Sequence, residues 1–223
     1  MSVLLVQDYL QTQGLRLPQE AVRIAYLAAQ SVMNMGKASI ERNVLWYEND
    51  EVVLAEHFEK NDENENLLKQ IFMALDSTVG RQKDLRSASV YVLMPSEKTP
   101  YLLRLAQQGQ VVEQKIMVNE ESGWQHLPSR AAQTGWLNLA NNVEQWLEWG
   151  DLQGEHNQRS QSQISLPICT AGGKVLGVLH AEHSSKNAFD ENAQADWAGL
   201  AIALTEPLKM LLNDESEEEE ADD

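Results

Sequence analysis

Apolar residues recur at helical spacing through most of the first third of the chain. Pro18 suits the start of a helix, because its missing N–H would be unpaired there anyway. Beyond it, apolar residues recur every three or four positions up to Met35, and Gly36 ends the run. A second apolar face runs from Leu67 to Val79, and the polar residues 60–66 before it predict a linker that caps this helix. The opening region is therefore predicted to be mainly helical.

Residues 39–60 are open to two interpretations. Ile40, Val44, Tyr47, Leu54 and Phe58 fit an amphipathic helix with a weak step at Glu51. The same residues also fit a hairpin that turns at Glu48-Asn49-Asp50. We favour the helix and keep the hairpin as the alternative.

From residue 85 the period changes to that of β-strands. Turn residues such as those at 95–100 and 171–174 separate neighbouring strands, which is typical of hairpins and hence of an antiparallel sheet. Helices are expected at 121–133, at 143–150 and from Asp190 or Glu191 onward, with a bend at Pro207. The fold class is therefore α+β. The predicted strands are 90–94, 101–106, 111–118, 136–140, 164–168 and 175–182.

Charge narrows the range of partners. The 223 residues include 17 basic and 34 acidic side chains, for a net charge of −17, and eight of the acids lie between Asp214 and Asp223. Without that acidic tail, predicted to be disordered, the chain carries only a moderate excess of negative charge. Acidic surfaces repel nucleic-acid phosphates and anionic lipids, so we expect neither a nucleic-acid nor a membrane partner.

The single cysteine, Cys169, precludes an intrachain disulfide and a cysteine-rich zinc site. No apolar stretch is long enough to span a membrane, and the N-terminus lacks the basic region of a signal peptide. These features favour a cytoplasmic protein.

Residues 123–212 resemble the GAF-domain family. The similarity is carried by Gly123-Trp124 with the helix that ends at Thr134-Gly135, by the hairpin strands Ile164–Ile168 and Gly173–His183, and by Asn187–Asp190 before the last helix. The resemblance extends back to the helix near Leu67. It implies an antiparallel sheet with helices on one face and a pocket on the other. The implied division is a helical N-terminal extension (1–60), a GAF-like domain (61–213) and the acidic tail (214–223).

The same resemblance indicates candidate ligand-binding residues. Gln163, His180 and Glu182 fall at pocket positions of the branch that reduces free methionine-R-sulfoxide, and strand parity places Tyr91 on the same face. Asn138 is a further candidate, with Trp136 and Trp146 as aromatic residues of a segment that closes over the pocket.

Chemistry by thiol or metal is not expected. The reductase branch uses cysteines, usually with a second thiol to resolve the oxidised form, whereas Cys169 stands alone and after the hairpin strand. His180 and His183 lie three apart on a strand and point to opposite faces, so they cannot chelate one ion. His180 and Glu182 share a face, and a metal site there would need a further ligand such as His126 or His156. We therefore expect no catalytic residues, no metal and no cofactor.

The leading functional hypothesis is a non-catalytic GAF-domain protein that senses a small ligand or acts as a regulatory adaptor. Its output would act in trans through a protein partner, and its terminal helices would form a homodimer. The alternative is a purely structural dimerisation or protein-interaction module whose pocket has degenerated. A thiol-dependent methionine sulfoxide reductase is the third hypothesis.

Overall fold

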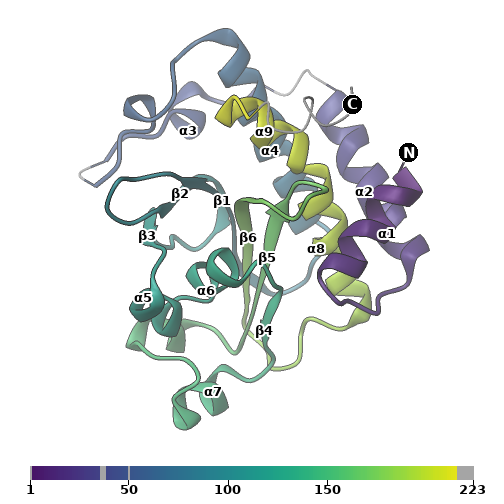
Figure 1. Ribbon diagram of the computed structural model, residues 1–223, viewed down its shortest axis with the longest axis vertical. Coiled ribbons are helices and arrows are strands. Elements are labelled where there is room, and N and C mark those ends of the chain that lie inside the picture. Colours follow the sequence, from purple (N-terminus) through teal and green to yellow (C-terminus); the bar gives the residue numbers. More distant parts are fainter. Residues whose placement is uncertain (1, 36–38, 50, 215–223) are drawn as a thin grey trace.

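The computed structural model describes residues 2–35, 39–49 and 51–214 of the chain. Its centre is a six-stranded sheet in the order β3-β2-β1-β6-β5-β4, in which all neighbours are antiparallel (Figure 1). The predicted α+β class is confirmed. The strands are β1 (Leu85–Met94), β2 (Tyr101–Gly109), β3 (Lys115–Met117), β4 (Asn138–Ala140), β5 (Ser162–Cys169) and β6 (Val175–His183).

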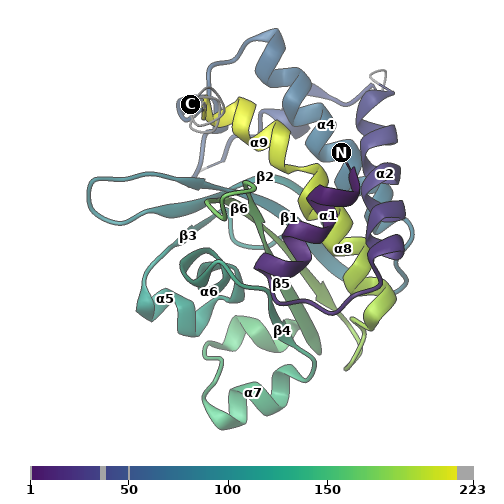
Figure 2. The ribbon, with the colours of Figure 1, turned by 45° about the vertical axis from the view of Figure 1, so that its right-hand side comes forward.

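One face of the sheet is covered by long helices, which stand together on one side in Figure 2. They come from both ends of the chain, so the N-terminal helices complete the same hydrophobic core as the C-terminal ones. Tyr9 fixes the first helix to the sheet, since its hydroxyl donates to the Pro167 carbonyl at 3.0 Å. These helices are α1 (Ser2–Thr12), α2 (Gln19–Asn34), α4 (Asp62–Val79), α8 (Glu191–Ala203) and α9 (Thr205–Leu212).

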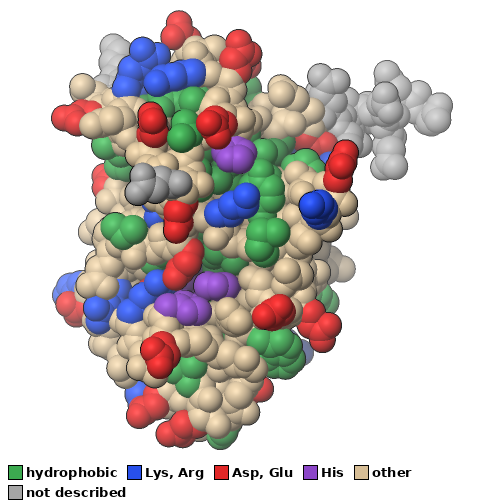
Figure 3. All heavy atoms as spheres, turned by 90° about the vertical axis from the view of Figure 1, so that its left-hand side faces the viewer, with side chains coloured by type: hydrophobic (Ala, Val, Ile, Leu, Met, Phe, Trp, Pro, Cys, Tyr) green, Lys and Arg blue, Asp and Glu red, His purple; other side chains and the backbone are tan. Residues whose placement is uncertain are grey.

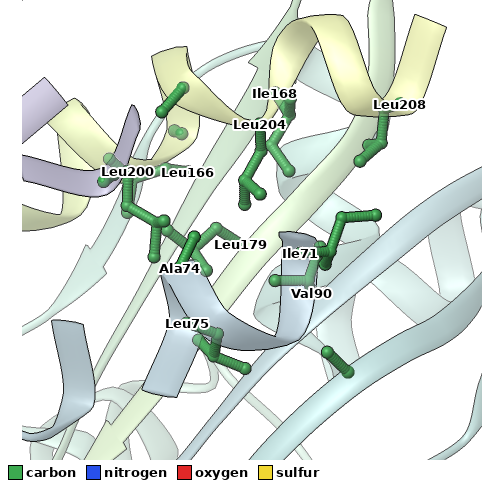
Figure 4. Packing of buried hydrophobic residues seen from close by; sticks show 14 of the residues in the cluster. Ile71, Ala74, Leu75, Val90, Leu166, Ile168, Leu179, Leu200, Leu204 and Leu208 are labelled. Atoms are coloured by element: carbon green, nitrogen blue, oxygen red, sulfur yellow. The ribbon is translucent and has the colours of Figure 1, made fainter. Parts of the chain in front are cut away.

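Figure 4 shows how this core is packed from aliphatic side chains of helices and strands. Leu75 of α4, Leu200 of α8, Val90 of β1 and Leu179 of β6 all belong to this core, and all four are fully buried. Burial of apolar side chains of this kind is the main source of folding free energy.

Side-chain caps fix two of these helix starts as the sequence predicts. Asn61 accepts a hydrogen bond from the Asn64 N–H at the start of α4, and Asp190 accepts one from the Ala193 N–H at the start of α8. The bend at Pro207 is also confirmed, because α8 ends at Ala203 and α9 begins at Thr205. Pro207 has no N–H for a continuous helix.

Shorter elements cover the second face of the sheet (Figure 2). Helix α6 (Leu127–Thr134) packs on β5 and β6, and α5 (Glu120–Gln125) packs on α6. Helix α7 (Val143–Trp149) and the 3₁₀ turn η2 (Glu155–Arg159) complete this cover.

The prediction of a single long helix over residues 39–60 is wrong. The structure has a short helix α3 (Arg42–Leu45), one antiparallel bridge between Glu48 and Val53, and a 3₁₀ turn η1 (Leu54–Glu56). The Asn49 side chain accepts from the backbone N–H groups of Glu51 and Val52, which holds a turn in place of a helix. The bridge resembles the hairpin alternative, although Asp50 of the predicted turn lies outside the described residues.

Two other elements differ from their predicted lengths. The helix expected at 121–133 is split at His126, because Pro128 in the first turn of α6 has no N–H to donate to the preceding turn. The strand expected at 111–118 is only three residues long, since residues 110–114 form a loop, in which the Gln114 carbonyl accepts from the Arg104 N–H of β2.

Some predictions stay untested. Gly36 and residues 215–223 of the acidic tail lie outside the described residues, and the division at residues 60 and 213 stays a prediction. Within the described ranges, no helix combines the length and apolar character needed to cross a bilayer.

Candidate functional site

A row of polar side chains crosses the second face of the sheet, which lies under α5, α6, α7 and η2 and is called the covered face below. The row runs where β1, β6 and β5 lie side by side. His180 and Glu182 of β6 are 4% and 1% exposed, and Gln163 of β5 is as deeply buried. The register places Gln163 opposite Glu182 and Ser165 opposite His180. Four predicted site residues thus share one face: Tyr91, Gln163, His180 and Glu182.

Arg159 is the centre of this polar row. Its Nε donates to both carboxylate oxygens of Glu182 at 2.9 Å, and its Nη2 donates to Glu182 Oε1 at 2.7 Å. Its Nη1 and Nη2 also donate to the two oxygens of Glu113, at 2.9 and 2.7 Å. One guanidinium therefore joins the sheet (Glu182) to the β2–β3 loop (Glu113), and charge-assisted pairs of this kind fix orientation.

Further hydrogen bonds hold the sheet residues in place. Ser165 Oγ and His180 Nδ1 are 2.8 Å apart, and His180 Nε2 lies 3.3 Å from Glu182 Oε1. Gln163 Nε2 donates to Asn157 Oδ1 and Ser160 Oγ at 3.0 and 2.9 Å. The polar row is thereby tied to the η2 segment that covers it.

The charges of the cluster set its protonation. Burial alone would raise the pKa of Glu182, but the hydrogen bonds from His180 and Arg159 outweigh it and lower the pKa to about 2. Burial likewise opposes ionisation of Glu113, and its bonds with Arg159 bring its pKa to about 2. Burial lowers the pKa of Arg159, but the two carboxylates reverse this effect and raise it. All three groups are charged at neutral pH.

Two histidines lie beside this ion-pair network. The rings of His126 and His156 are stacked with centroids 4.5 Å apart, and His156 Nε2 donates to the Gln125 carbonyl at 3.0 Å. Burial, followed by the positive potential of His156, lowers the pKa of His126 to about 4, so its ring is neutral at pH 7.

An open cleft of about 470 Å³ reaches the network from outside. Its charged lining residues are Glu51, Glu113 and Arg159, and Val111 and Val112 add apolar surface. In Figure 3 this side of the molecule shows acidic, basic and histidine side chains close together. A solute in the cleft would meet the Arg159 guanidinium, behind which Glu182 is buried.

The other three predicted site residues are not part of this cluster. Trp136 is 56% exposed, and its ring lies against Gly14 in the loop after α1. Asn138 lies opposite Ser165 at the sheet edge, with its amide donating to the Trp136 carbonyl. Trp146 packs in a separate small cluster with Val143, and the guanidinium of Arg130 lies over its ring at 5.8 Å from the ring centroid. The structure does not bring these residues to the cleft beside Arg159.

Comparisons with known proteins identify the architecture. No protein-family model and no curated protein sequence matches the chain. Solved structures do match, although at low sequence identity. A type II free methionine-R-sulfoxide reductase from Thermoplasma acidophilum aligns with a TM-score of 0.57 and 17% identity, over 67% of this chain and 96% of its own.

Two further solved structures carry the GAF name. A GAF sensor protein from Burkholderia vietnamiensis aligns with a TM-score of 0.58 and 17% identity, over 87% of this chain and 98% of its own. The GAF domain of an Acinetobacter phosphoenolpyruvate-protein phosphotransferase aligns with a TM-score of 0.53 and 14% identity, over 85% of this chain and 93% of its own. The chain has the GAF-domain fold.

The GAF-domain fold does not by itself decide between binding and catalysis, because sensors and reductases both occur among these matches. Cys169 lines a different cavity of about 100 Å³, next to Tyr9 and Ile202 on the helical side. Burial raises the pKa of its thiol to about 11, so the thiolate form is scarce at neutral pH.

Sequence reasoning did not identify Glu113 or Arg159 as site residues. Glu113 lies in a loop with no recognisable motif, and its pairing with Arg159 spans 46 residues. His126 and His156 were considered only as additions to His180. The single available signal was Arg159 itself, a cation placed just before a buried strand of polar and apolar residues.

Proposed function

We propose that this GAF domain is a non-catalytic regulatory protein that binds a small polar ligand at the Arg159–Glu182 network and passes the signal to a partner protein. The observation that carries the proposal is the buried polar row on one sheet face with an open cleft directly outside it. A face made only for packing would be apolar, as the helical face is.

Two serine hydroxyls on the same face support a binding role. The Oγ atoms of Ser87 and Ser89 are buried and have no hydrogen-bond partner among the described residues. They lie opposite Glu182 and His180 in the register of β1 and β6. A buried hydroxyl without a partner is destabilising by about 1–3 kcal/mol. A ligand or water that reaches this face would therefore find donors and acceptors ready to pair.

The charges favour a ligand with a cationic or hydrogen-bond-donating group. Glu51 and Glu113 line the cleft, and Glu182 lies behind Arg159. A cationic group could replace the guanidinium between the two carboxylates, which would free the Arg159 side chain and the η2 segment. Ligand binding would then change the cover of the sheet, and this change would be the signal.

The position of Cys169 supports a non-catalytic role. Its thiol lines the helical-side cavity together with Tyr9, whereas the charged cluster of Glu113, Arg159 and Glu182 lies on the other face of the sheet. A redox reaction at the cluster would need a thiolate there. Conversion of free methionine sulfoxide by the wild type with a thiol reductant, lost in Cys169→Ser, would contradict this part of the proposal.

Native mass spectrometry of the protein purified from cells, followed by a thermal-shift screen of metabolites, tests the sensor role. We expect a small ligand that raises Tm, and we expect its effect to disappear in a His180→Ala, Glu182→Ala double variant. His183→Ala on the same strand is the matched control, since its ring points away from the cluster and bonds the Lys83 carbonyl. No bound ligand and no thermal shift would contradict the sensor role.

A second role, homodimerisation, is favoured by exposed apolar residues on the first two helices. Ile24 and Leu27 lie one turn apart on α2 and are 58% and 42% exposed, and Val3 and Leu4 of α1 are exposed too. We propose that this surface pairs two copies of the chain. Sedimentation analysis should give a dimer for the wild type and a monomer for Ile24→Glu, Leu27→Glu. A monomeric wild type would exclude this role without affecting the sensor proposal.

A further inference from the structure

Three potential metal ligands meet in the cover of the sheet. Glu113 comes from the β2–β3 loop, His126 from the junction of α5 and α6, and His156 from η2. One ligand atom from each lies within 4.8 Å of the other two. Ligands of a tetrahedral zinc ion lie about 3.3 Å apart, so modest side-chain rotations would bring all three onto one ion.

The types of ligand suit a divalent transition metal ion. Two imidazoles and one carboxylate are a recurrent set for zinc sites that keep an open position for water or substrate. Hard cations such as Ca²⁺ prefer oxygen ligands, so the two imidazoles favour a softer ion.

The surroundings of His156 fit a ligand role. Its Nε2–H donates to the Gln125 carbonyl, which leaves the lone pair on Nδ1 and fixes the orientation of the ring. Histidines that bind metals usually donate their second ring N–H in this way.

The ion pair of Glu113 with Arg159 is compatible with a metal ion. Each carboxylate oxygen has two lone pairs, and Arg159 uses one on each oxygen of Glu113. If a metal ion displaced the guanidinium, Arg159 would keep its bonds with Glu182 at 2.7–2.9 Å. The two carboxylates and one guanidinium also leave one negative charge, which attracts a cation.

We infer that Glu113, His126 and His156 form a binding site for a divalent first-row transition metal ion such as Zn²⁺, with an open coordination position toward the cleft. The ion would join the β2–β3 loop, the α5–α6 junction and η2, which are the three segments that surround Arg159. This inference does not depend on the small-ligand proposal, because the metal ion alone is the probe.

The first test follows the five histidines of the full-length protein by NMR after treatment with a chelator. Stoichiometric Zn²⁺ should shift the ring nitrogen signals of His126 and His156 and leave those of His57 and His183 in place. Unchanged His126 and His156 signals at saturating Zn²⁺ would overturn the inference. This readout needs no variant and therefore does not depend on how well a variant folds.

The second test measures Zn²⁺ affinity by calorimetry. Since loss of an outer hydrogen-bond partner already weakens metal sites about 10–100-fold, a His126→Ala, His156→Ala double variant should bind more than about 100-fold more weakly. A His57→Ala, His183→Ala variant should bind like the wild type. Binding by the first variant within about threefold of the wild type would contradict the site.

Calcium distinguishes the site from the acidic tail. The residues from Asp214 to Asp223 offer only oxygen ligands, so excess Ca²⁺ should displace any Zn²⁺ held there. The histidine site should retain Zn²⁺ in excess Ca²⁺. Complete displacement of Zn²⁺ by Ca²⁺ would show binding by carboxylates alone and would overturn the inference.

Discussion

The two faces of the sheet are built from alternate residues of the same strands but differ in chemistry. On the helical face, Val90 of β1 and Leu179 of β6 contribute only apolar surface. On the covered face, Tyr91, His180 and Glu182 from those same strands are equally buried, and all three carry polar groups. Because burying ionised groups is unfavourable without partners, the covered face is held by pairing, whereas the helical face is held by packing.

This difference separates stability from function. The helical face is expected to determine how strongly the fold resists unfolding. The ion pairs of the covered face hold the buried Glu182 in its charged form against desolvation, but an apolar face of similar volume would be about as stable. Stability alone therefore does not require polar residues on this face, and we propose that they serve binding.

Leu75→Ala should have the largest effect on stability. Leu75 is fully buried on α4, which packs against β2 and β1, so truncation removes apolar contacts and leaves a cavity. We expect a loss of about 2–5 kcal/mol in the free energy of unfolding, measured by urea denaturation. Metal and ligand binding at the covered face should be unchanged under folding conditions. A loss below about 1 kcal/mol would mean that the helical face does not carry the core.

Glu182→Gln should change the pH dependence of stability. The folded-state pKa of Glu182, about 2, is below its ordinary value of 4.5. Ionised Glu182 therefore stabilises the fold above pH 4.5, and this contribution is lost as the pH falls toward 2. The linkage amounts to about 3 kcal/mol between these limits.

Urea denaturation of wild type and Glu182→Gln at several pH values measures this contribution. The stability of the variant should fall less steeply between pH 4.5 and 2, and Glu113, which titrates in the same range, remains in both proteins. Parallel pH profiles would show that the pair with Arg159 does not hold the charge of Glu182.

The helical face was largely predictable from the sequence, because its information is local. The helical period of Leu67–Val79, the cap at Asp190 and the alternation in β1 each act over a few residues. The segment 39–60 was predicted wrongly for the same reason. Its apolar spacing fits a helix, but the side chain of Asn49 pairs with its own backbone and holds a turn.

The covered face was only partly predictable. The polar residues of its strands were found from parity and from the family resemblance, since Gln163, His180 and Glu182 lie in regular strands. Glu113 and the approach of His126 to His156 depend on how loops fold over the sheet. Such contacts between distant loops leave no periodic trace in the sequence.

Gly154→Ala tests the segment around η2 that covers the polar row, and we expect a smaller loss of stability than for Leu75→Ala. Gly154 has φ of +92°, and a Cβ there would lie 2.8 Å from His156 Nδ1. Backbone strain and displacement of the ring together should reduce stability by about 1–3 kcal/mol and weaken Zn²⁺ binding. Gly150→Ala is the matched control, because its φ is +78° but nothing lies within 4 Å of the added Cβ. If both variants bind Zn²⁺ equally well, the position of His156 is not important for the site.

The smallest effect is expected for the exposed tryptophans. Trp136 and Trp149 are 56% and 65% exposed, and neither lines the cleft beside Arg159. Replacement of either by Ala should change stability by no more than about 0.5 kcal/mol. Neither replacement should alter the thermal shift produced by a ligand of the polar cluster. A ligand effect lost in Trp136→Ala but kept in Trp149→Ala would show instead that an aromatic residue closes over the ligand. The covered face would then extend beyond the polar row to β4, and Asn138, which bonds to the Trp136 carbonyl, would become part of the site.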